Sequence, residues 1–105
     1  MLSRAFGDFE MKNFGVKAEP HISRKEIHSD IEGNNLFMVL ACDGIWDVLS
    51  EKEVQNIIKY EINKNIEGSI SNHNNITERM SNTILNSAIV NGAWDNLSLF
   101  VVKLT

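Results

Sequence analysis

The chain has 105 residues, 43% hydrophobic and 23% charged, which is typical of a globular protein and excludes a disordered chain or a coiled coil. Its 10 basic and 14 acidic residues give a net charge of -4. That balance argues against a general nucleic-acid binder and against an anionic membrane surface as partner. The length fits one compact domain.

Cysteine usage and hydropathy limit the compartment in which the protein works. Cys42 is the only cysteine, so no internal disulfide forms, and its place inside an apolar run indicates a reduced protein. The longest apolar run covers residues 36 to 42, whereas a bilayer-spanning helix needs about 20 residues. We therefore expect an intracellular protein, cytoplasmic or nuclear, that does not act at a membrane.

The first part of the chain carries turn signals rather than periodic patterns. Residues 2–9 (LSRAFGDF) show no helical stripe and contain the turn pair Gly7-Asp8. Residues 21–27 predict a short strand with Ile22 and Ile27 as its apolar positions, and the polar residues 29–35 predict a loop.

The strongest strand signal is the apolar run from Leu36 to Cys42 (LFMVLAC). A continuous apolar run of this length between turn signals predicts a fully buried strand. The dipeptide Asp43-Gly44 ends the run and predicts a turn. A second aspartate, Asp47, follows four residues after Asp43.

A capping box predicts the start of the first helix. The Ser50 hydroxyl can accept from the N–H of Glu53, while the Glu53 side chain reaches back to the N–H of Ser50. Apolar side chains at helical spacing extend the helix from about Glu51 to Lys64, with Glu61 largely outside the stripe. The stripe consists of Val54, Ile57, Ile58, Ile62 and Ile66.

A second helix and a last strand complete the predicted elements. Residues 67–75 form a linker rich in Ser and Asn, after which Thr77 can cap a helix that ends at Gly92. Its apolar positions are Met80, Ile84, Leu85, Ala88 and Ile89. Residues 97–104 (LSLFVVKL) are rich in β-formers and apolar on both faces, which predicts another strand.

This order of elements predicts an α+β fold. An αα-hairpin between two strands returns the chain to the edge it left, so the strands become antiparallel neighbours with both helices on one face. Asp43, after the first strand, and Asp95, before the second, then lie at the same edge of the sheet. Because helices cover one face only, the isolated chain is expected to expose a large apolar patch, to associate or to be poorly soluble.

Asp43, Asp47 and Asp95 are the candidate site residues. Carboxylates gathered at one edge cannot all stay ionised without a cation. Oxygen ligands suit Mg²⁺ or Mn²⁺ rather than Zn²⁺, and a water on such an ion can become a nucleophile. The alternative that Asp43 and Asp95 are only turn residues stays open. An EF-hand loop is excluded, because residues 43–47 lack its alternating ligands and terminal Glu.

Three segments together resemble a known family: LSRAFGDF at 2–9, ACDGIWDVLS at 41–50 and WDNLSLFVV at 94–102. Their order and separation are similar to the last signature segments of the type 2C metal-dependent protein serine/threonine phosphatases. The resemblance covers essentially the whole chain, and a Glu-Pro step at 19–20 also fits. It implies that residues 1–105 are the C-terminal part of a single phosphatase catalytic domain. The N-terminal half, with an Asp-Gly-His-Gly metal segment and a phosphate-binding Arg, is expected to be absent.

The resemblance also implies a fold, a reaction and ligands. Members of the family fold as a β-sandwich of antiparallel sheets flanked by antiparallel helix pairs, of which this chain would be a part. They hydrolyse phosphoserine and phosphothreonine with two, in some members three, Mg²⁺ or Mn²⁺ ions, and a metal-activated water attacks phosphorus directly. By this resemblance Asp43 and Asp95 are metal ligands, and Asp47 is a ligand of a weaker third metal.

Activity and partners follow from the same resemblance. Without the other half the chain alone is expected to be inactive. Its partners would be phosphoprotein substrates and either the missing half or a second copy that covers the apolar sheet face. A non-catalytic regulatory or interaction module that keeps the fold is the alternative function. The converging carboxylates favour the enzyme, because a pure scaffold has no physical need for them.

Four further side chains have more than one interpretation. Arg4 and Asp8 are candidates for an indirect role near phosphate or metal, and an internal polar contact that orders their segment explains them as well. Trp46 is interpreted as a core or half-buried anchor. Cys42 is interpreted as a small buried hydrophobe rather than a nucleophile, since no His stands near it.

Overall fold

The computed structural model describes residues 3–26, 36–66 and 76–104. It divides the chain into two compact units, Met1–Glu32 and Gly33–Thr105, and each is described by itself. None of the described helices is long and apolar enough to cross a membrane. The single phosphatase domain inferred for residues 1–105 stays a prediction.

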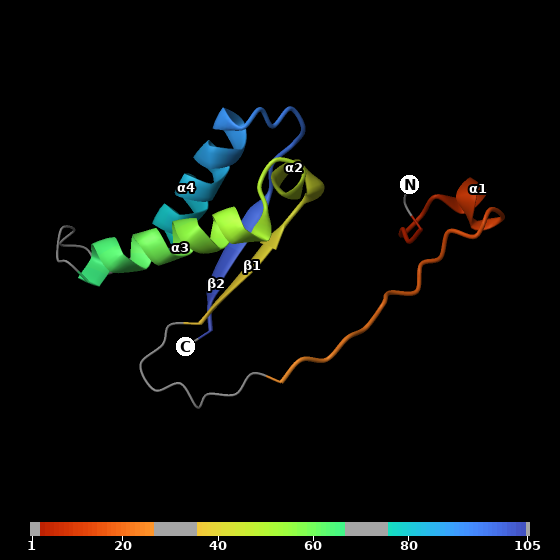
Figure 1. Ribbon diagram of the computed structural model, residues 1–105. Helices are drawn as coiled ribbons and strands as arrows, with labels where there is room; N and C mark the ends of the chain where they lie inside the picture. Colours follow the sequence, from red (N-terminus) through yellow and green to blue (C-terminus); the bar gives the residue numbers. More distant parts are fainter. Residues whose placement is uncertain (1–2, 27–35, 67–75, 105) are drawn as a thin grey trace. The chain divides into compact units, whose positions relative to one another are not determined.

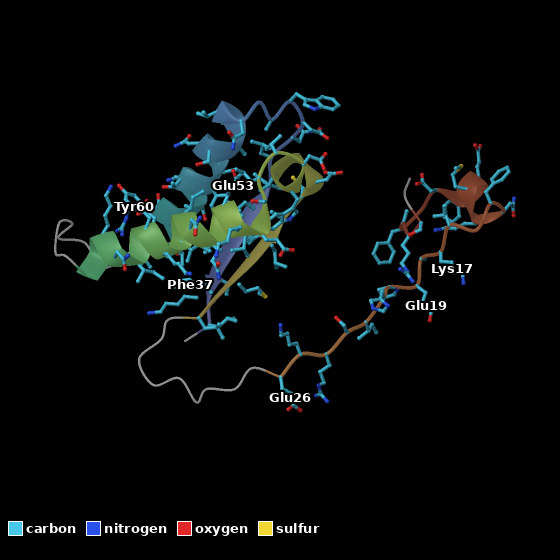
Figure 2. All side chains as sticks on the ribbon, in the orientation of Figure 1. Lys17, Glu19, Glu26, Phe37, Glu53 and Tyr60 are labelled. Atoms are coloured by element: carbon cyan, nitrogen blue, oxygen red, sulfur yellow. The ribbon has the colours of Figure 1, made fainter. Side chains whose placement is uncertain are left out.

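The first unit contains a loop closed by backbone hydrogen bonds. The N–H of Ala5 donates to the carbonyl of Lys17 at 3.0 Å, and the N–H of Lys17 donates to the carbonyl of Ser3 at 3.1 Å (Lys17 is labelled in Figure 2). Inside the loop lies the short helix α1 (Phe9–Lys12), which no sequence pattern predicted. Asp8 precedes it with a left-handed backbone, φ 49°, a conformation that Asp tolerates better than most residues.

The strand predicted over residues 21–27 is wrong for the part that the structure describes. Residues 21–26 belong to no helix or strand, and their side chains are exposed. A strand needs a neighbour that satisfies its backbone groups, and the described chain offers this segment none. Ile27 and the loop predicted over 29–35 lie outside the described residues.

The second unit is built on a two-stranded antiparallel sheet, as predicted. β1 (Phe37–Ala41) pairs with β2 (Leu99–Lys103), and both strands are slightly shorter than the apolar runs that predict them. The backbone contact continues one step further, because the N–H of Cys42 donates to the carbonyl of Ser98 at 3.1 Å. The fold is α+β, and the second sheet of the expected sandwich stays a prediction.

In the described part of the chain between the two strands, the structure has three helices (Figure 1). The helix α2 (Asp43–Trp46) stands where a simple turn was predicted. The helices α3 (Glu51–Ile66) and α4 (Ile76–Val90) form the predicted pair, with α4 beginning one residue before its expected cap, Thr77. The chain leaves α4 through Gly92, whose φ of 86° suits a glycine that ends a helix.

The capping box at the start of α3 forms as predicted. The N–H of Ser50 donates to the Glu53 carboxylate at 2.8 Å, and the N–H of Glu53 donates to the Ser50 hydroxyl at 3.3 Å. The hydroxyl also donates to the carboxylate, and these bonds from Ser50 lower the pKa of the Glu53 carboxyl. Figure 2 shows Glu53 in the first turn of α3. The linker predicted over 67–75 lies outside the described residues.

Both long helices cover the same face of the sheet, as predicted (Figure 1). Burial alternates along the strands, so a slip of one residue in the register would turn the covered side chains outward. The inner face contributes Val39, Ala41, Leu99 and Val101. The buried residues against which this face packs are Ile45, Leu49, Val54, Ile84 and Ala88.

The other face of the sheet is apolar and exposed. Met38 stands opposite Val102, and Leu40 stands opposite Phe100, whose side chain is 69% exposed. The prediction of an exposed apolar patch is therefore confirmed for this chain. These four residues are called the open sheet face below.

A buried ion pair connects α3 to α4. Glu61 is 5% exposed and accepts from Nε of Arg79 at 3.2 Å and from the hydroxyl of Thr83 at 3.0 Å. Helical spacing placed Glu61 outside the apolar stripe of the predicted helix. Its burial therefore differs from that prediction. The carboxylate can be buried because a cation and a hydroxyl on α4 compensate its lost hydration.

Candidate metal centre

Two of the candidate carboxylates belong to neighbouring strand ends. Asp43 begins α2 two residues after β1 ends, and Asp95 lies four residues before β2 begins. Because Ala41 stands opposite Leu99 in an antiparallel pair, the end of β1 and the start of β2 form one edge of the sheet. The predicted pairing of these two strand ends is confirmed.

Asp43 and Asp95 each accept a hydrogen bond from the next backbone amide. Oδ1 of Asp43 accepts from the N–H of Gly44 at 3.0 Å, and Oδ1 of Asp95 accepts from the N–H of Asn96 at 2.7 Å. Both side chains are exposed, and neither Oδ2 takes part in these bonds. Turn residues make the same bonds, so they are compatible with both interpretations of the two aspartates.

Asp47 and Asp95 line one small cavity. Its volume is about 20 Å³, enough for a single water or ion. The structure thus brings Asp47 and Asp95 together at one cavity. Asp43 does not line this cavity, although the next residue, Gly44, does. The lining residues are Gly44, Asp47, Val48, Ala93, Trp94 and Asp95.

The sulfur of Cys42 contacts the loop that follows Asp95. The thiol donates to the carbonyl of Asn96 at 3.2 Å and accepts from the N–H of Ser98 at 3.3 Å. The hydrogen bonds from Ser98 lower the pKa of the Cys42 thiol, more than burial raises it. Cys42 is half-buried rather than a simple hydrophobic filler. Only the strand register, which sets residue 42 against Ser98, could have revealed this contact.

Gly44 packs directly against the same loop. A Cβ at this position would stand 2.6 Å from the carbonyl oxygen of Asn96 and 3.1 Å from a side-chain carbon of Leu97. Such a separation from a backbone oxygen is shorter than side chains tolerate, so only glycine lets α2 and the loop approach this closely. The pair Asp43-Gly44 therefore ends β1 and also allows α2 to pack against the loop at residues 96–97.

The remaining candidate residues have local roles. Arg4 forms a backbone bridge with Lys17 in the first unit, and no ion pair joins it to Asp8 within the described chain. The side chains of Arg4 and Asp8 are exposed. The indole N–H of Trp46 donates to the carbonyl of Ala41 at 3.1 Å, and the side chain is 37% exposed, more than predicted for a core or half-buried anchor.

The carboxylate oxygens of the candidate residues fit a hard cation, but the described ligands are too few to form a complete site. Carboxylate oxygens are the ligands that Mg²⁺ and Mn²⁺ prefer. Among the described residues, no three side chains of His, Cys, Asp or Glu are gathered so that they could hold an ion. A metal site that uses Asp43, Asp47 and Asp95 therefore needs further ligands.

Comparison with known proteins assigns the chain to a family. The model of the family "Protein phosphatase 2C" matches residues 1–97. Probable protein phosphatase 2C 7 of Oryza sativa subsp. japonica is 35% identical over 102 residues, which cover 97% of this chain and 22% of the rice protein. Protein phosphatase ppm-1.A of Caenorhabditis elegans is 32% identical over 109 residues, covering 96% of this chain and 21% of the worm protein.

A shorter stretch is more similar still. Probable protein phosphatase 2C 61 of Arabidopsis thaliana is 47% identical over 57 residues, which cover 54% of this chain and 16% of the plant protein. The chain thus spans about a fifth of the length of these relatives. No solved structure matches it. Since the family model covers most of the sequence, the chain belongs to the protein phosphatase 2C family.

Proposed function

We propose that this chain is part of a catalytic domain that hydrolyses phosphoserine and phosphothreonine in proteins with the help of Mg²⁺ or Mn²⁺. Membership of a phosphatase family supports the reaction class. The observation that carries the proposal is the strand pairing, which brings the segments of Asp43 and Asp95 to one edge of the sheet. The cavity shared by Asp47 and Asp95 adds support, because oxygen ligands around a small space suit such ions.

The three aspartates have different roles in this proposal. Asp43 and Asp95 hold the ions, and Asp47 belongs to a weaker third site. A bound divalent ion polarises phosphoryl oxygens and lowers the pKa of water. The chain itself keeps the carboxylates in a fixed geometry, since α2 orders Asp43 and Asp47 while the bond from Asn96 orients Asp95.

The open sheet face is proposed to pack against the rest of the catalytic domain. Its four apolar side chains form two adjacent cross-strand pairs, a contiguous patch that soluble proteins usually cover. The matched relatives are several times longer than this chain, so they have further residues that could do so. The isolated chain is proposed to be inactive, because the carboxylates within residues 3–26, 36–66 and 76–104 do not gather in the number that two ions need.

The test is an assay on a serine-phosphorylated peptide, with and without Mn²⁺, that compares the complete catalytic domain with the 105-residue chain. We expect metal-dependent turnover by the complete domain and none by the chain. Asp43→Asn and Asp95→Asn should each lower turnover of the domain by orders of magnitude, because each removes a ligand from the ions. Asp47→Asn should have a milder effect.

A matched control separates these roles from a general effect of charge. Glu78→Gln removes an exposed carboxylate in the first turn of α4 and should leave turnover unchanged. Turnover by the bare chain, or full activity of the domain that carries Asp95→Asn, would refute the assignment. A folded complete domain without any turnover would favour the non-catalytic interaction module instead.

A further inference from the structure

Cys42 connects the two segments that carry the candidate ligands. It precedes Asp43, and its backbone N–H donates to the carbonyl of Ser98 at 3.1 Å. Its sulfur accepts from the N–H of Ser98 at 3.3 Å and donates to the carbonyl of Asn96 at 3.2 Å. One residue therefore makes three hydrogen bonds to the chain that follows Asp95.

The carbonyl of Asn96 is held from two sides. The thiol of Cys42 donates to it, and the backbone of Gly44 lies so close that a Cβ there would stand 2.6 Å away. The N–H of the same residue, Asn96, donates to Oδ1 of Asp95. A displacement of Asn96 would therefore move the Asp95 carboxylate relative to Asp43.

We propose that Cys42 is a positioning residue whose thiol sets the distance between Asp43 and Asp95. This inference rests on the proposed function, in which these aspartates are metal ligands. The thiol acts by satisfying the carbonyl of Asn96 and the N–H of Ser98 together, which a purely apolar side chain cannot do. Groups that orient metal ligands in this way commonly change metal affinity about 10–100-fold when they are replaced.

Two substitutions separate hydrogen bonding from packing. Cys42→Val keeps an apolar side chain of similar size and loses both hydrogen bonds of the sulfur. Cys42→Ser keeps a group that donates and accepts but gives up apolar contact. If Cys42 only fills space, the valine variant should behave like the wild type and the serine variant should be impaired. If Cys42 positions the loop, the order is reversed.

The first measurement is Mn²⁺ binding to the complete catalytic domain by calorimetry. We expect Cys42→Val to weaken binding about tenfold or more and Cys42→Ser to recover most of the affinity. Ile57→Val, which removes one methyl group from a partly buried side chain of α3, serves as the control and should leave the Mn²⁺ affinity unchanged. Wild-type affinity in the valine variant, or a serine variant as weak as the valine variant, would overturn the inference.

The second measurement needs no metal and keeps the two proposals distinguishable. Hydrogen exchange of the Ser98 amide in the metal-free domain should be faster in Cys42→Val than in the wild type, and slower again in Cys42→Ser. Equal exchange in all three proteins would refute the positioning role. If the wild-type domain binds no Mn²⁺, the proposed function fails, and the exchange rates alone decide whether Cys42 holds the loop.

Discussion

Replacement of Gly44 by alanine would test how tightly the candidate centre is built. The new Cβ would stand 2.6 Å from the Asn96 carbonyl oxygen, whereas ordinary contact begins near 3.4 Å, so the two segments must separate by about 0.8 Å. The obstacle is backbone rather than the end of a flexible side chain, and Asp95 immediately precedes it. We therefore expect the shift to reach the Asp95 carboxylate.

The size of the effect can be estimated for stability and for turnover separately. Forcing extra volume into a packed contact costs about 1–3 kcal/mol. Gly44 has a helical backbone in α2, so the better helix propensity of alanine offsets up to about 1 kcal/mol. With the full offset, the free energy of unfolding should thus fall by no more than about 2 kcal/mol. Misplacement of a catalytic group by about 1 Å can cost about a hundredfold in rate, so turnover should fall far more than stability suggests.

The assay compares urea unfolding with Mn²⁺-dependent turnover in the complete catalytic domain. Ile84→Val is the control, because it shortens a fully buried side chain of α4 at a cost of about 0.5–1.5 kcal/mol and adds no atom near Asn96. This control should keep its turnover. Wild-type turnover in Gly44→Ala, or equal losses of turnover in both variants, would show that the close approach does not position Asp95.

Three further predictions concern stability and association. Leu40→Lys combined with Phe100→Lys should make the 105-residue chain less prone to associate in sedimentation experiments, and a monodisperse monomer without these changes would contradict the prediction. Glu61→Ala leaves its partner guanidinium without a counter-charge and should cost about 3 kcal/mol in urea unfolding of the complete domain, the lower end for a buried pair because the Arg79 side chain is 23% exposed. A neutral effect would argue against the buried pair. Because bonds from Ser50 lower the pKa of Glu53, their stabilisation is present above the unfolded pKa of about 4.3 and is lost as the pH falls through the folded pKa. The stability gap between Ser50→Ala and the wild type should thus be largest at neutral pH and narrow in acid, without closing, because the bond from the N–H of Glu53 to the Ser50 hydroxyl does not titrate. A gap that does not change with pH would refute this linkage.

Elements with local signals could be predicted from the sequence. The capping-box pattern at Ser50 and Glu53 predicts both of the hydrogen bonds that form there. Gly92 follows the end of α4 with a positive φ, as a glycine after a helix commonly does. Glu61 could not be predicted as buried, because its partners lie on another helix and helical spacing alone puts it outside the apolar stripe. Local sequence patterns indicate where a helix or strand forms, whereas the burial of a side chain depends on the other elements that pack against it.

At the candidate centre, too, some features could be predicted from the sequence and others could not. The residue types and the strand order predicted which carboxylates share an edge, since Asp43 follows one strand and Asp95 precedes its antiparallel neighbour. The contacts of Cys42 and Gly44 with the Asn96 loop could not be predicted, because they require the register of β1 against β2. Sequence reasoning therefore found the candidate ligands and missed the residues that contact the loop beside them.

The apolar runs of both strands bear on the proposed domain and on the proposed metal centre together. Val39 and Leu40 are adjacent and both apolar, yet Val39 packs against the helix layer while Leu40 is 53% exposed. Successive side chains of a strand point to opposite faces, so an unbroken apolar run is suited to two apolar layers. The described residues supply one of these layers, and under the proposed function their carboxylates would supply part of a ligand set. We expect the surface that covers the open sheet face to belong to the same domain as the ligands that Asp43, Asp47 and Asp95 still need.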